Sequence, residues 1–157
     1  MSTLGKVLIG VGVATTAVMV ALAVYMAAFP TTTHAGDSVT IGSGATRVAV
    51  TLVGPPKRVK DEGDGWCIVR CQLRFKNVGD QLYHTTVYQW CELETTTHGV
   101  VVGQSSKGFL DDLLPDTIEM DPGASAEATV DFMVRSATGF KAFSYQGPDD
   151  IVVVWKL

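Results

Sequence analysis

The chain has 157 residues, with 12 Lys and Arg against 16 Asp and Glu and a net charge of −4 at pH 7. Binding to nucleic-acid phosphates needs a basic surface, so this charge balance argues against a nucleic-acid partner. The length is that of one domain with a modest core, less any terminal segment that lies outside it.

The first predicted element is an apolar helix at the amino terminus. No charged side chain occurs from Val7 to Phe29, and a helix of that length, at about 1.5 Å per residue, crosses a hydrocarbon core of about 30 Å. Lys6 precedes the run, and the positive-inside tendency then leaves the amino terminus in the cytoplasm. Residues 1–29 are therefore predicted to be a single-pass anchor in the cell membrane, with the C-terminal domain extracytoplasmic.

A cleaved signal peptide is the alternative to an anchor. Its apolar region usually has about 7–15 residues, which is shorter than the run here, so the length favours the anchor. However, Thr33 and Ala35 form the small-x-small arrangement of a cleavage site. Cleavage there would release a secreted protein. Both alternatives stay open at this point.

The next predicted element is a flexible spacer over residues 30–44. This stretch is rich in Thr, Ser and Gly and has no periodic apolar pattern, apart from a short edge strand expected from Val39 to Ile41. The folded domain is predicted over residues 45–157.

Alternating apolar residues in this domain predict strands separated by turns. A strand over residues 47–53 is followed by a connection over residues 54–65, because Pro55 and Pro56 cannot sit inside a β-ladder. The next strand is the most regular of the chain. Five side chains form its apolar face: Cys67, Val69, Cys71, Leu73 and Phe75. A turn over Asn77–Asp80 then ends it, because Asn and Gly accept a positive φ.

Beyond this turn a further strand is predicted over residues 86–93, and a turn at His98-Gly99 extends it. The connection from Ser105 to Pro115 has apolar residues at helical spacing, which predicts one short helical turn. A turn at Asp121-Pro122-Gly123 follows, and three strands complete the domain, over residues 128–134, 140–146 and 151–157. This pattern predicts an all-β fold, an antiparallel β-sandwich preceded by one N-terminal transmembrane helix.

Several segments of the chain occur in the order found in one bacterial family: FKNVGD, a later CEL…G strand, MDPGASAEATVDFMV, FSYQG and VVVWKL. From Val48 to Leu157 the chain resembles the immunoprotective extracellular, immunoglobulin-like domain family of bacterial lipoproteins and membrane-anchored proteins. The most specific matches are Asn77, Gly79, Asp80, Pro122, Gly123 and Phe132. The resemblance implies a sandwich exported behind a lipoprotein signal or a membrane helix. It implies no particular activity, because the family has no assigned general function.

The three cysteines leave three alternatives open. Export brings the domain into an oxidising compartment, in which two of the three thiols can pair. Cys67 and Cys71 lie about 13 Å apart along one extended strand, whereas a disulfide needs Cα atoms within about 7 Å. The disulfide candidates are therefore Cys71–Cys91 and, second, Cys67–Cys91. Three buried free thiols are the third alternative.

The sequence predicts that the protein is not an enzyme. It contains no nucleophile elbow, zinc-protease motif or phosphate-binding glycine loop. Cys91 and His98 are a conceivable nucleophile and base, but Cys91 belongs to a buried strand face where an apolar environment raises a thiol's pKa. The carboxylates of the 61–64 segment match no defined calcium loop. No catalytic residue, metal site or cofactor is therefore predicted.

The predicted function is binding. Asp111, Asp112, Leu113 and Leu114 lie in the long Ser105–Pro115 connection, and a rigid sandwich positions its loops for recognition. These four are the predicted contact residues for a protein partner, which is an envelope protein, a host component or a subunit of a membrane complex. The alternatives are an accessory or solute-binding module for a cell-wall or small-molecule ligand, and a prophage-type exclusion protein.

The predicted anchor can be tested by cell fractionation. If residues 7–29 are an uncleaved anchor, the protein stays in the membrane fraction after alkaline washing, because apolar burial in the bilayer does not depend on charge. Protease added to intact cells should then digest the chain beyond Pro30. Recovery of a soluble chain that begins near Gly36 would show instead that the segment is a cleaved signal.

Overall fold

The computed structural model describes residues 31–105 and 116–157. Residues 31–157 form one compact unit. The predicted anchor, Val7 to Phe29, lies outside the described residues. Within the described ranges, no helix is long and apolar enough to cross a membrane.

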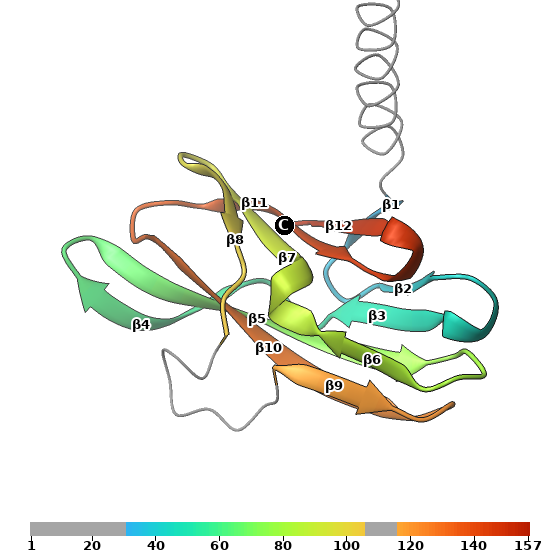
Figure 1. The fold of residues 1–157 in the computed structure, drawn as a ribbon. Coiled ribbons are helices and arrows are strands. Elements are labelled where there is room, and N and C mark those ends of the chain that lie inside the picture. Colours follow the sequence, from blue (N-terminus) through green and yellow to red (C-terminus); the bar gives the residue numbers. More distant parts are fainter. Residues whose placement is uncertain (1–30, 106–115) are drawn as a thin grey trace, which may run out of the picture. The chain divides into compact units, whose positions relative to one another are not determined.

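The described strands form two facing five-stranded sheets and one small ladder (Figure 1). The first sheet has the order β1-β12-β11-β7-β8, with bounds Thr31–His34, Val152–Lys156, Phe140–Gln146, Cys91–Thr95 and Gly99–Val102. The second has the order β10-β5-β3-β2, with β4 also on β5, and bounds Ser125–Arg135, Trp66–Asn77, Val48–Leu52, Ser38–Ile41 and Lys57–Gly63. The ladder joins β6, Tyr83–Thr86, to β9, Thr117–Met120. The predicted all-β sandwich is confirmed.

The second sheet is built around β5. One edge of β5 pairs antiparallel with β10 from Trp66 to Lys76, and the other edge pairs with β3 and then with β4. The predicted alternation of β5 is confirmed, since all five side chains of its apolar face are buried: Cys67, Val69, Cys71, Leu73 and Phe75. Arg74 and Lys76, from the opposite face, are exposed.

The prolines between β3 and β4 interrupt pairing with β5, but the chain pairs with β5 again beyond them. Pro55 and Pro56 have no N–H to donate, so pairing with β5 stops after β3 and resumes with β4. The predicted connection over residues 54–65 is therefore wrong in its extent, because most of it is strand. Residues 54–56 and the Asp64-Gly65 turn remain outside the strands. The turn has φ of 50° and 76°, as two-residue hairpin turns require.

The core lies between the two large sheets. Phe75 of β5 meets Tyr145 of β11 edge to face, with ring centroids 5.4 Å apart, and Phe132 of β10 meets Phe143 of β11 at 6.1 Å. Trp155 of β12 lies 5.8 Å from Phe143 and is fully buried. Each aromatic pair contributes about 0.5–1.5 kcal/mol beyond the burial of its surface. The alternating apolar residues of the strands predicted over residues 128–134 and 140–146 are thus buried, as expected.

The predicted flexible spacer over residues 30–44 is not what the structure contains. β1 pairs in parallel with β12, and β2 pairs antiparallel with β3. The edge strand expected from Val39 to Ile41 is confirmed as β2. Most side chains of β1 and β2 are exposed or half-buried. These strands therefore join their sheets through backbone pairing at the edges and not through a buried apolar face.

Residues 86–93 do not form the predicted single strand. β6 ends at Thr86, a 3₁₀ turn follows from Val87 to Trp90, and β7 begins at Cys91. Val87 and Cys91 are both buried as predicted. Apolar residues four apart fit a strand and a helical turn alike, so periodicity does not distinguish the two.

All three cysteines are buried free thiols. The structure thus corresponds to the third alternative for Cys67, Cys71 and Cys91. Cys71 lies on β5 and Cys91 on β7, and these strands belong to opposite sheets and are not neighbours in one hairpin. Burial raises the pKa of both Cys71 and Cys91. Neither thiol is therefore a thiolate nucleophile near neutral pH.

Asn77 holds the turn that ends β5. Its buried amide donates to the backbone oxygens of Gln81 and Met120 at 2.7 and 2.9 Å, and its Oδ1 accepts from the Gly79 N–H at 3.0 Å. A Cβ added at Gly79 would lie 2.1 Å from the Ala45 carbonyl oxygen. Two of the residues that carry the family resemblance are therefore explained by folding and not by recognition.

Replacing Asn77 with Ala is expected to lower the free energy of unfolding by about 2–4 kcal/mol, because buried backbone groups left without a partner cost about 1–3 kcal/mol each. Asp80→Ala is the matched control. Its side chain lies exposed in the same turn, and the expected change is within about 0.5 kcal/mol. Urea unfolding measures both, and equal losses in the two variants would contradict the role of Asn77.

Candidate functional site

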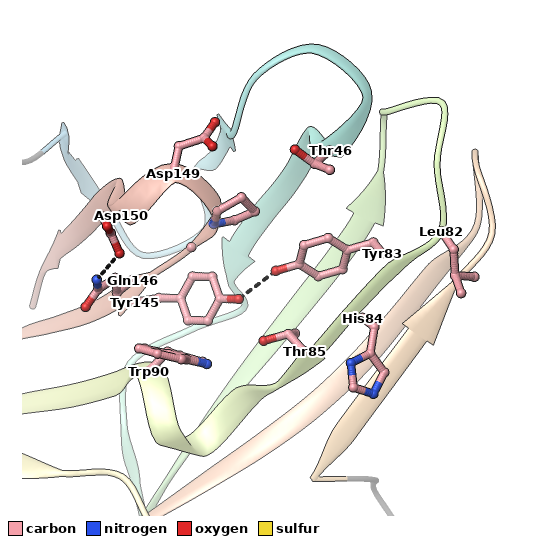
Figure 2. A pocket seen from close by; sticks show the side chains of 12 residues that line it. Thr46, Leu82, Tyr83, His84, Thr85, Trp90, Tyr145, Gln146, Asp149 and Asp150 are labelled. Atoms are coloured by element: carbon pink, nitrogen blue, oxygen red, sulfur yellow. Dashed lines mark hydrogen bonds between the residues drawn. The ribbon is translucent and has the colours of Figure 1, made fainter.

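The predicted contact residues Asp111, Asp112, Leu113 and Leu114 lie outside the described residues, so the structure places none of them. Within the described part of the chain, the candidate site is a pocket of about 500 Å³ (Figure 2). Side chains of β6, of the 3₁₀ turn Val87–Trp90 and of the end of β11 line it, together with the 3₁₀ turn Pro148–Asp150.

Two buried tyrosines form the floor of the pocket. Tyr83 of β6 and Tyr145 of β11 point toward each other, and their hydroxyl oxygens lie 2.8 Å apart (Figure 2). Tyr83 is 6% exposed and Tyr145 is fully buried. The bond joins the small ladder to the first sheet. Each hydroxyl can donate one hydrogen bond, so one donates within the pair, and Thr85 also bonds to the two phenols.

Burial is the main cause that raises the pKa of both phenols. At Tyr83, hydrogen bonds with Tyr145 and Thr85 lower the pKa in part. At Tyr145, the neighbouring Tyr83 raises the pKa further, and a hydrogen bond with Thr85 acts against it. Both phenols are therefore neutral near pH 7 and serve as hydrogen-bonding groups, not as charges.

The rim of the pocket is aromatic and polar. Trp90, at the end of the 3₁₀ turn, is 46% exposed, so much of its indole is open to solvent. His84 is exposed on β6. Asp149 and Asp150 are exposed in the turn before β12, and Gln146 Nε2 donates to Asp150 Oδ1 at 2.9 Å. The pocket therefore combines one open indole with hydroxyl, amide and carboxylate groups.

The electrostatics of the pocket disfavour an anion. Its described lining residues include two carboxylates, Asp149 and Asp150, and no Lys or Arg. Both residues have positive φ, 59° and 57°, a conformation that Asp tolerates better than most residues. The arrangement can accept hydrogen bonds from a ligand and can pack against an apolar face, so it fits a neutral or positively charged ligand.

The other residues considered from the sequence do not converge on a site. Cys91 begins β7, whereas His98 lies in the turn after that strand, so a nucleophile–base pair is not formed. Asp61 accepts a hydrogen bond from the Gly63 N–H at 2.9 Å. Among the described residues, no group of three or more His, Cys, Asp or Glu side chains could hold a metal ion.

Sequence reasoning missed the pocket residues. Tyr145 was expected on a core face, and Trp90 was placed within a strand. The one available signal is a tryptophan outside the alternation of its neighbours, which is typical of a large side chain without a place in the core.

Comparisons with known proteins address the fold. No family model matches the chain, and no curated protein matches it. The secreted protein MPT63 from Mycobacterium tuberculosis has a similar structure, with a TM-score of 0.61, 12% identity, and coverage of 83% of this chain and 99% of that one. The yjhA protein from Bacillus subtilis has a TM-score of 0.56, 15% identity, and coverage of 80% and 99%.

A third similar structure is an uncharacterized β-sandwich protein from Clostridium difficile 630, with a TM-score of 0.51, 11% identity, and coverage of 82% and 95%. The fold is a β-sandwich. At identities this low the likeness concerns the fold alone, and nothing about a ligand passes from these proteins to this chain.

Tyr145→Phe tests the hydroxyl pair. The unfolded chain loses its phenol protons near pH 10, whereas the raised pKa values keep Tyr83 and Tyr145 protonated in the folded chain to higher pH. Their contribution to stability is therefore complete below about pH 10 and declines above it, by up to about 1.4 kcal/mol per pH unit for each tyrosine.

In Tyr145→Phe, urea unfolding between about pH 9 and 11 should show a shallower decline of the free energy of unfolding than in the unchanged protein, because one shifted phenol is gone. An equal decline in the two proteins would mean that Tyr145 is not protected from ionisation.

Proposed function

We propose that the protein is a membrane-anchored, extracytoplasmic binding domain of the cell envelope, that it acts by recognition and not by catalysis, and that its pocket takes a hydroxyl-rich saccharide of the envelope. The predicted apolar run from Val7 to Phe29 supports the location. The raised pKa of the buried Cys71 and Cys91 thiols supports the absence of a thiol nucleophile.

The observation that carries the proposal is the half-exposed indole of Trp90 beside the Tyr83–Tyr145 hydroxyl pair. A pyranose ring has a flat face of C–H groups and a periphery of hydroxyls. The Trp90 indole offers a rigid apolar surface against which the C–H face can pack. The Gln146 amide and the rim carboxylates of Asp149 and Asp150 offer hydrogen bonds to the hydroxyls, above the floor that the tyrosine pair forms.

The acidic rim selects among saccharides. Asp149 and Asp150 repel the carboxylate of a uronic acid and attract the ammonium group of a glucosamine unit. No Lys or Arg of the described lining opposes them. The expected order of affinity is therefore glucosamine oligosaccharides first, N-acetylglucosamine oligosaccharides second and uronic-acid oligosaccharides last.

The pocket favours this ligand class over the protein partner that the sequence favours. Concave sites with a few convergent polar groups are typical of small ligands, whereas protein partners use flatter patches with an aromatic core and a polar rim. Recognition of a protein through residues 111–114 stays a prediction.

We also propose that the chain is a divergent member of the immunoprotective extracellular, immunoglobulin-like family that it resembles. The strand order supports an immunoglobulin-like topology. Along the chain, β7, β8, β11 and β12 take the places of strands C, C′, F and G, and they are neighbours in one sheet in the order β12-β11-β7-β8. Likewise, β3, β5 and β10 take the places of A, B and E in the other sheet.

Calorimetric titration tests the saccharide proposal. The full-length protein in detergent is titrated with each of the three oligosaccharide classes. Trp90→Ala should lower the affinity for the glucosamine oligosaccharide at least tenfold, a loss of about 1.4 kcal/mol, because it removes the stacking surface. Val59→Ala, at an exposed valine of β4 that does not line the pocket, is the control and should bind as before. Equal affinity in Trp90→Ala, or no binding by any of the three classes, would reject the proposal.

A further inference from the structure

Among the described strands, β8 pairs only with β7, and its other edge lacks the charged side chains that protect another sheet edge. Its four residues, Gly99–Val102, include no charged side chain, and Val100 and Val102 are 57% and 58% exposed. β4 is also an edge strand, but five of its seven residues are charged: Lys57, Arg58, Lys60, Asp61 and Glu62. Charges on an edge discourage pairing with another chain, whereas exposed apolar side chains leave that pairing open.

The hydrogen bonds of β8 show which of its backbone groups face outward. The Gly103 N–H donates to the Cys91 oxygen at 2.8 Å. In an antiparallel ladder alternate residues bond to the same neighbour, so Val101 also directs its N–H and C=O to β7. The N–H and C=O of Val100 and Val102 then point away from β7, toward the open edge.

The next residue whose backbone groups point toward the open edge is Gln104, and these groups already have a partner. Gln104 donates to the Asp131 oxygen of β10 at 2.9 Å and accepts from the Asp131 N–H at 3.3 Å. At Val100 and Val102 the structure gives no such bond within residues 31–105 and 116–157. Backbone pairing on this edge therefore begins at Gln104, just after β8, and does not continue to Val102 and Val100 among the described residues.

A groove of about 550 Å³ lies beside the unfilled part of the edge. Val100–Val102 form one wall, and Met133, Val134 and Trp66 contribute to the other. No carboxylate is among its described lining residues, and its one permanent charge is Arg135, whose guanidinium carbon lies 4.1 Å from the Trp66 ring centroid.

We propose that β8 binds an extended segment of a partner protein by strand addition, and that this segment is apolar at alternate positions and carries one carboxylate. Its backbone bonds to the outward groups of Val100 and Val102, and its alternate side chains enter the groove. In the register of the Gln104–Asp131 bridge, Arg135 lies at the level of Val100, where it pairs with the carboxylate. No described residue lines both this groove and the saccharide pocket, so the two sites are independent.

A random heptapeptide phage library, selected on the full-length protein in detergent, tests the proposal. The enriched peptides should alternate apolar and polar residues, contain Asp or Glu and lack proline at their centre. A synthetic peptide of the enriched sequence should then bind and change the fluorescence of Trp66.

Val102→Pro is the decisive variant for this peptide. It removes an N–H that faces the open edge and not β7, a position where strands tolerate proline, and the affinity should fall at least tenfold. Val102→Thr keeps the N–H and a β-branched side chain, and its affinity should change less than about threefold, within the range of a small edge substitution. Arg135→Gln should weaken the acidic peptide but not its Gln counterpart.

If Val102→Pro does not fold, Val100→Glu makes the same test, because it places a negative charge at an exposed side chain of the edge, beside the carboxylate of the peptide. Undiminished binding by a folded Val102→Pro or Val100→Glu variant would overturn the proposal. So would enriched peptides without alternation, or a sedimentation result in which a second copy of the chain occupies the edge and excludes the peptide.

Discussion

The fold depends on the pairing of β5 along both of its edges. β10 covers one edge from Trp66 to Lys76, and β3 and β4 share the other. The polar face of this sheet is also fixed, because Arg70 forms a two-point ion pair with Asp131, both contacts at 2.8 Å, and Asp131 is fully buried. A strand held in this way presents its apolar face to the first sheet in a single register.

The pocket is a consequence of where β5 ends. The Asn77 amide bonds to the backbone of the next turn and of β9, so the β6–β9 ladder starts at a fixed place. Tyr83 then reaches Tyr145 of the first sheet. The gap at this junction is lined by the turn that carries Trp90. A rigid junction between the ladder and the first sheet therefore holds the proposed ligand groups in position before any ligand arrives.

The buried strands can be predicted from the sequence because every second side chain that faces the core is apolar. The apolar faces of β5, β10 and β11 alternate with period two and are predicted from the sequence, whereas β12 is predicted as a strand without an assigned face. β1 and β4 were missed because their side chains are mostly exposed and they join their sheets through backbone bonds. Cys71 and Cys91 lie on β5 and β7 of opposite sheets and not on one hairpin, and both are free thiols. Tyr83 and Tyr145 form a site only in three dimensions, and no local pattern marks them.

Nitrogen-15 NMR of the three tryptophan indoles shows most directly where a saccharide binds, because each indole occupies a different place. Trp90 borders the pocket, Trp66 lines the groove, and Trp155 is buried with its Nε1 donating to the Asp37 oxygen at 3.3 Å. On titration with a glucosamine oligosaccharide, the Trp90 signal should shift progressively while those of Trp66 and Trp155 stay in place. A titration that moves Trp66 or Trp155 and leaves Trp90 unchanged would contradict recognition at the pocket.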